Sequence, residues 1–110
     1  MPPEAWKPST AIDAAVRQWM ARHGFKVNST RYYFDEEIYA WRHEMAEASP
    51  TLWISRTVLE DSDPAALVAG LERLGIAKRM RGAPKARFLI AEEGAQLTVT
   101  AWGHGPHTGA

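Results

Sequence analysis

The sequence predicts an α+β fold, a two-layer sandwich in which two helices cover one face of a mainly antiparallel sheet of about five strands. Three observations lead to this prediction. Two segments repeat apolar residues at helical spacing, and five others are rich in aromatic and β-branched residues. Their order is helix, three strands, helix, two strands. Consecutive strands joined by short turns pair antiparallel, and two amphipathic helices then bury one sheet face.

The first predicted helix begins at Thr10, which stands three residues before Asp13 at the spacing of a capping box. We expect it to end at Gly24, because glycine readily takes the left-handed conformation that follows a last helical turn. The apolar residues that share one face of this helix are Ile12, Val16, Trp19 and Met20.

The second predicted helix has clearer boundaries. Asp63 is a favourable N-cap, Pro64 suits the first helical position, and Gly75 provides the same ending as Gly24. Its predicted buried stripe consists of Leu67, Val68, Leu71 and Leu74.

Five segments are predicted as strands: 25–34, 38–45, 51–59, 86–91 and 96–101. The last alternates Leu97, Val99 and Ala101 with polar residues, which is typical of a half-buried strand. The sequence does not fix the register, and a shift by one residue would exchange the two faces of a strand.

Length and composition favour one domain over residues 1–102, with an extended arm over 1–9 and a flexible tail over 103–110. The 110 residues include no cysteine, which excludes disulfides, thiolate zinc sites and cysteine nucleophiles. Thirteen basic and thirteen acidic residues give a net charge of zero. No apolar run reaches membrane-spanning length, and no secretory signal is evident. We therefore expect a cytoplasmic protein without a membrane partner.

Aromatic residues and arginines alternate along the predicted strands. Because neighbours on a strand point to opposite faces, some of the rings should lie on the face that the helices leave open. Tyrosine, tryptophan and arginine dominate protein interfaces, which favours binding of a protein partner or a second copy. Base stacking and plain cross-strand stabilisation are the alternatives. The candidate binding residues are Arg31, Tyr33, Tyr39, Trp41, Arg42, Trp53 and Arg56.

A second candidate is a predicted basic loop over residues 78–87. It carries five cations and no acid and could neutralise several phosphates, so nucleic-acid binding is the alternative function. A purely structural explanation of these cations is that they follow the second predicted helix, because positive charges near the C-terminus of a helix, like negative charges near its N-terminus, interact favourably with the helix dipole. The cations are Lys78, Arg79, Arg81, Lys85 and Arg87.

Catalytic and metal-binding signatures are weak. His43 and Glu44, with Glu47, could bind a metal or exchange protons, but the second histidine of a zinc-protease motif is missing. We interpret this segment as an exposed strand end. No catalytic residue, metal site or cofactor is predicted. The expected function is that of a small non-catalytic interaction module that binds a protein partner or a second copy of itself as a homodimer.

Overall fold

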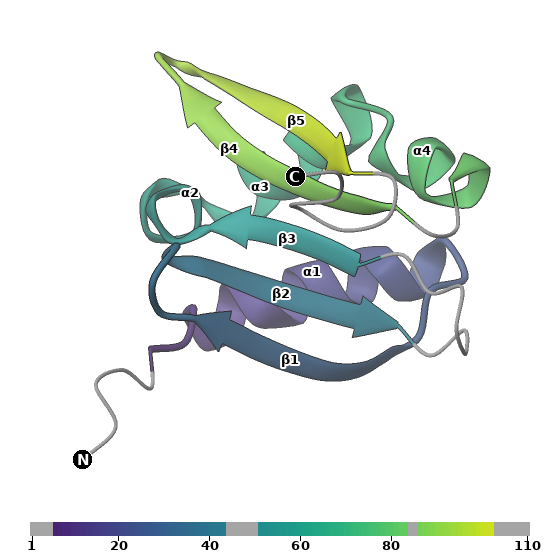
Figure 1. The fold of residues 1–110 in the computed structure, drawn as a ribbon, viewed down its shortest axis with the longest axis horizontal. Coiled ribbons are helices and arrows are strands. Elements are labelled where there is room, and N and C mark those ends of the chain that lie inside the picture. The colour runs from purple at the N-terminus through teal and green to yellow at the C-terminus, as the bar shows by residue number, and fades with distance from the viewer. Residues whose placement is uncertain (1–5, 44–50, 84–85, 103–110) are drawn as a thin grey trace.

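The computed structural model describes residues 6–43, 51–83 and 86–102, and these form one five-stranded sheet covered by helices on a single face (Figure 1). The α+β class and the one-sided helical layer are as the sequence predicts. In chain order the elements are α1 (Thr10–Arg22), β1 (Val27–Tyr33), β2 (Ile38–His43), β3 (Thr51–Ser55), α2 (Arg56–Asp61), α3 (Pro64–Arg73), α4 (Ile76–Gly82), β4 (Arg87–Glu93) and β5 (Gln96–Trp102).

The strands lie in the sheet in their sequence order, β1 to β5. The first three form an antiparallel meander, and β4 and β5 form an antiparallel hairpin. Between them, β3 and β4 pair in parallel. A parallel pair needs a long connection to return the chain to the same end of the sheet, and the three helices α2 to α4 form that connection. The sheet is thus mainly antiparallel, with one parallel pair.

The second helical region contains three helices instead of one. The predicted strand over 51–59 is wrong in its second half, because the Ser55 hydroxyl accepts from the backbone N–H of Val58 at 3.3 Å and starts α2. Farther on, Asp63 caps α3 as predicted, and Gly75 ends it with φ of +66°. The chain then re-enters a helix, so the predicted basic loop is helical over Ile76–Gly82.

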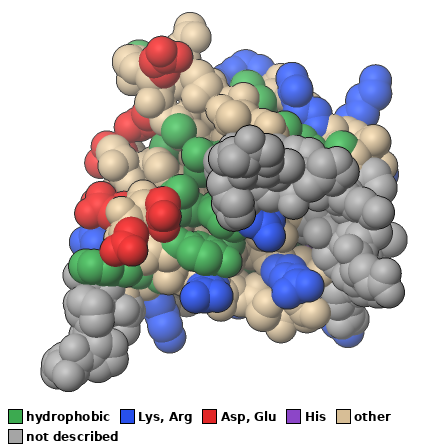
Figure 2. Space-filling model, in the orientation of Figure 1, with side chains coloured by type: hydrophobic (Ala, Val, Ile, Leu, Met, Phe, Trp, Pro, Cys, Tyr) green, Lys and Arg blue, Asp and Glu red, His purple; other side chains and the backbone are tan. Residues whose placement is uncertain are grey.

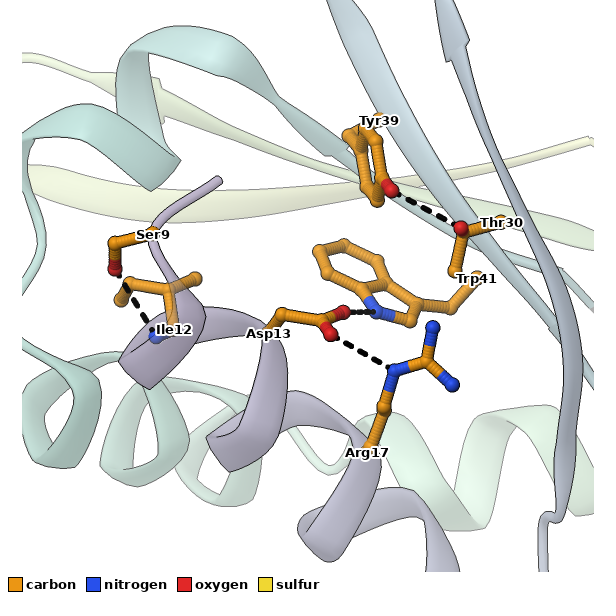
Figure 3. Close-up of polar contacts among 7 residues, drawn as sticks. All are labelled: Ser9, Ile12, Asp13, Arg17, Thr30, Tyr39 and Trp41. Carbon is orange, nitrogen blue, oxygen red and sulfur yellow. Dashed lines mark hydrogen bonds and ion pairs between the residues drawn. The ribbon is translucent and has the colours of Figure 1, made fainter. Parts of the chain in front are cut away.

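Helix α1 begins at Thr10, as predicted, but its N-cap is one residue earlier. Ser9 is the N-cap, and its hydroxyl accepts from the backbone N–H of Ile12 at 3.1 Å (Figure 3). Gly24 takes the left-handed conformation with φ of +88°, as predicted, which lets the Phe25 N–H donate to the Met20 carbonyl at 2.8 Å. Phe25 is thereby folded back into the core.

The main core fills the space between the sheet and the four helices. Helix α3 approaches the sheet closely at Gly70, where an added Cβ would lie 2.5 Å from a methyl carbon of Leu97 on β5. Within the described ranges, none of the helices has the length and apolar character to cross a membrane. The largest fully buried side chains of the core include Trp19, Met20, Trp41, Leu52, Ile54, Leu67, Leu71, Ile76, Met80 and Ile90.

Candidate interaction surface

The strand register assigns each side chain to the helical face or to the open face of the sheet. Tyr39 on β2 is paired with Tyr32, and both pack into the main core beneath the helices. Ala40 is paired with Arg31 on one side and with Trp53 on the other, and this row faces away from the helices. By the same alternation the open face carries Ser29, Arg31, Tyr33, Ile38, Ala40, Arg42, Thr51, Trp53, Ser55, Arg87, Leu89, Ala91, Glu93, Gln96, Thr98 and Thr100.

Tyr39 and Trp41 do not lie on this open face, so the prediction that places their rings there is wrong. Both are buried beneath α1. The Tyr39 hydroxyl donates to Thr30 Oγ1 at 3.0 Å, and the Trp41 indole donates to Asp13 Oδ1 at 2.9 Å (Figure 3). Their polar atoms are therefore satisfied within the chain, and their rings belong to the core.

Arg56 is also displaced from the predicted surface, because it begins α2 instead of continuing a strand. Its guanidinium donates to the Tyr32 hydroxyl at 3.2 Å and to Glu60 at 2.9 Å, and it lies 5.0 Å from the ring centroid of Trp6. The hydrogen bonds to Tyr32 and Glu60 raise the pKa of Arg56. Arg56 thus joins the N-terminal segment, β1 and α2 at one end of the molecule.

Four side chains of the open face form a continuous ladder of ring and cation contacts. Tyr33 on β1 and Trp53 on β3 stack with centroids 4.6 Å apart and planes 17° apart. They meet above β2, where the small Ala40 leaves room between them. The Arg31 guanidinium lies 4.7 Å from the Tyr33 centroid, and the Arg87 guanidinium lies 5.4 Å from the Trp53 centroid.

The rings of this ladder lie on buried apolar side chains, and an arginine flanks the ladder at each end. Ile38 and Ala40 are buried against the stacked rings, and Trp53 itself is only 6 % exposed. Among the residues that the structure describes, Phe34 is the one large apolar side chain that is clearly exposed, at 46 %. The open face is therefore not a bare apolar patch, and a partner would meet guanidinium groups, hydroxyls and ring edges.

The arginines of the open face stand close together. Arg42, Thr51 and Arg87 occupy one row across β2, β3 and β4, so the two arginines are two strand spacings apart, about 10 Å. Arg31 lies in the next row of β1. Within residues 6–43, 51–83 and 86–102, no carboxylate lies within ion-pair distance of these three arginines.

The predicted basic loop does not join this cluster as a unit. Lys78, Arg79 and Arg81 lie on α4, in the helical layer behind the sheet (Figure 1). Arg79 donates to the Leu74 carbonyl at 3.1 Å and Arg81 to the His23 carbonyl at 3.4 Å, which satisfies backbone acceptors at two helix ends. Lys85 lies outside the described residues. Of the four cations that the structure describes, Arg87 alone reaches the open face.

The prediction that His43 lies at an exposed strand end is wrong. The side chain is buried, with 1 % of its surface exposed. It faces the helices, with its ring 4.9 Å from that of Phe25, and neither ring nitrogen has a hydrogen-bond partner among the described residues. Burial lowers its pKa, because the site disfavours the charged imidazolium. Glu44 and Glu47 lie outside the described residues. The described part of the chain contains no cluster of three potential metal ligands.

A polar contact between α1 and α3 had no signal in the sequence. The buried Trp19 donates its indole N–H to Glu72 Oε2 at 2.5 Å, and the His23 ring lies 2.7 Å from the same oxygen. Hydrogen bonds from His23 and Trp19 lower the pKa of Glu72. These residues are about fifty positions apart, so only the packing of the two helices brings them together. The contact connects α1 and α3 within the helical layer and does not involve the open face.

Comparison of the chain with protein-family models, with curated proteins and with solved structures gave no match.

Proposed function

We propose that this chain is a non-catalytic protein-binding module whose binding surface is the open face of the sheet. The observation that supports the proposal is the ladder of Arg31, Tyr33, Trp53 and Arg87 on a face that no described helix covers. Tyrosine, tryptophan and arginine are the residue types that dominate binding hot spots.

The ladder also has the rigidity that a binding surface needs. A long side chain that must be ordered on binding costs about 0.5–1.5 kcal/mol. Arg31 and Arg87 already rest against rings, and those rings are fixed by their mutual stacking and by the β2 side chains beneath them. Part of the ordering cost is therefore met in the unbound protein, and the guanidiniums are presented in a fixed arrangement.

Site-specific photo-cross-linking in cells tests this proposal. A benzophenone side chain at Ser29 or Thr100 places the reactive group on an exposed part of the open face, whereas Gln18 on the exposed side of α1 provides the matched control. We expect adducts with polypeptides from the two sheet positions and few from Gln18. Equal yields at all three positions would show that the open face is not a specific binding surface.

Nucleic-acid binding is the second candidate, and one observation favours it. Arg87 joins Arg31 and Arg42 on the same face as two aromatic rings, which is a combination found in single-strand binding surfaces. This function predicts that a labelled single-stranded oligonucleotide binds with an affinity that falls steeply with salt. Arg42→Glu should abolish the anisotropy change, while Lys78→Glu on α4 should not. Salt-independent or absent binding would exclude this function.

A further inference from the structure

Extending the binding function proposed above, and resting on it, we propose that the partner is a second copy of this chain. The two open sheet faces meet across a two-fold axis, so that the arginine-bearing end of each face lies against the acidic end of the other.

The open face is polarised along its strands. Arg42 lies near the end of β2 and Arg87 begins β4, and their shared row lies at one end of the sheet. The turns at the opposite end carry exposed acids, Asp35–Glu37 between β1 and β2 and Glu93 at the end of β4. Figure 2 shows this face, with acidic side chains gathered at the end where these two turns lie and basic side chains mostly toward the other end.

The spacing of these charges is self-complementary. Arg87 and Glu93 are both on β4, six residues apart, so they share the open face and stand about 20 Å apart along the strand. A two-fold axis that lies in the interface and runs across the strands turns each sheet end for end while keeping β4 over β4. Arg87 then faces Glu93 of the second copy, and the reverse pair forms by symmetry.

The same rotation pairs the other charged group. Arg42 lies near the end of β2, and the turn over residues 34–37 lies where β2 begins. Turning the sheet end for end places Arg42 opposite this turn of the second copy. Each arginine row thus meets an acidic turn without any residue from outside the chain, which is the reciprocity that a symmetric dimer requires.

The middle of the face suits close contact between two sheets. The two rows on either side of the proposed axis carry the stacked rings of Tyr33 and Trp53. The other side chains of these rows are Arg31, Ile38, Ala40, Ser55, Leu89, Ala91, Thr98 and Thr100. Packed sheets lie about 10 Å apart, a separation that the two stacked rings and the mostly small, hydroxyl or aliphatic side chains around them allow. The face measures about 20 Å in each direction by strand spacing, which is small for an interface, so we expect a micromolar and salt-sensitive dimer.

The acidic turns favour this occupant over a polyanion. Phosphates lying along the face would meet the arginines at one end and the carboxylates of the two turns at the other. A second copy matches both ends at once.

Sedimentation velocity over a range of protein concentrations at low and high salt tests the proposal. We expect a concentration-dependent dimer that weakens by roughly tenfold or more at high salt. Arg87→Glu and Glu93→Arg should each weaken the dimer to a similar extent, because each places like charges opposite one another. Lys78→Glu makes the same change of charge on α4 and should leave the dimer intact. Arg42→Glu repeats the test at a position without a ring contact, and thermal unfolding confirms that each variant is folded.

A mixture of the two single variants provides the decisive measurement. In a heterodimer of the Arg87→Glu and Glu93→Arg chains, both facing pairs are again of opposite charge. We therefore expect the mixture to associate more tightly than either variant alone, and the double variant to associate with itself. If each substitution instead damaged only the fold of its own chain, mixing the two variants would not restore association.

Three outcomes would overturn the proposal. The first is a monomer at every concentration, and the second is a dimer whose affinity is unchanged by salt and by these substitutions. The third is a monomeric full chain whose shortened form ending at Trp102 dimerises, because residues 103–110 would then be the occupant of the face. If the chain is monomeric but Ser29 still cross-links to other polypeptides, the proposed binding function stands and only the self-association fails.

Discussion

Replacing Asp13 with alanine should destabilise the protein by removing the hydrogen-bond acceptor of a buried tryptophan. Trp41 is 0 % exposed, and its indole N–H donates to Asp13 Oδ1 at 2.9 Å (Figure 3). The second carboxylate oxygen accepts from Arg17 Nε, also at 2.9 Å. The Asp13→Ala variant leaves the indole donor buried without this acceptor and leaves Arg17 facing water.

The two losses differ greatly in size. A buried donor that loses its acceptor costs about 1–3 kcal/mol. The ion pair is worth at most about 0.5 kcal/mol, because the side chains of Arg17 and Asp13 are 45 % and 31 % exposed and solvent screens them. We expect a total loss of about 2 kcal/mol in the free energy of unfolding, which corresponds to a fall of roughly 8–10 °C in Tm for a domain of this size.

Urea unfolding followed by far-ultraviolet circular dichroism measures this loss. The comparison needs the parent protein, Asp13→Ala, Trp41→Phe and the double variant, since the cycle removes any contribution of Asp13 to the helix dipole. We expect a coupling of about 1–2 kcal/mol between Asp13 and Trp41, and a loss below about 0.5 kcal/mol for Arg17→Ala alone. If Asp13→Ala costs the same in the Trp41→Phe background, the indole hydrogen bond does not contribute to stability and the reasoning is refuted.

Burial lowers the pKa of His43, so the unfolded chain takes up a proton near pH 6.5 while the folded chain resists it to lower pH. Stability should be full above pH 6.5 and decline below it; urea titrations at pH 7.5 and 5 should show a loss that is smaller in His43→Phe, and an unchanged loss would contradict this. Glu72→Ala should lower the Tm by removing the acceptor of the Trp19 indole, whereas Glu72→Gln keeps an acceptor and should lower it less. Gly75→Ala should cost about 1–2 kcal/mol, because φ of +66° is unfavourable for any residue with a Cβ. Gly75→Asn should lose less in the same urea assay, because asparagine tolerates the left-handed conformation better than alanine and nothing lies near the added Cβ.

The layer arrangement was predictable because its causes are local. Asp63 accepts from the backbone N–H groups of Ala65 and Ala66 at 3.1 and 3.3 Å, as its position before Pro64 indicated. The helix at 56–61 was not predicted, because Val58 and Leu59 resemble the end of a strand. Their burial in the main core, with α2 against β3 and β4, depends on the direction in which the chain leaves the sheet, and local sequence does not specify that direction.

The open face was predicted only in part, because alternation alone does not say which set of rings lies beneath the helices. One signal in the sequence could have decided it. Arg42 on β2 is charged and is expected to face solvent. Because side chains two positions apart share a face, Ala40 and Ile38 lie on the same face as Arg42, and Tyr39 and Trp41 must face the core. The contact of Arg87 with Trp53 needs the parallel pairing of β3 and β4, which brings together residues far apart in the sequence.

The parallel pairing makes the proposed surface conditional on complete folding. Thirty-six positions separate each residue of β3 from its partner on β4, as in Thr51 and Arg87. Pairing these two strands therefore has a large entropic cost. We expect the β4–β5 hairpin to join the sheet late. Because Tyr33 and Trp53 lie on one side of this junction and Arg87 and Glu93 on the other, a partly folded chain carries two unconnected halves of the surface. A partner that recognises the whole ladder would thus distinguish finished molecules from unfinished ones.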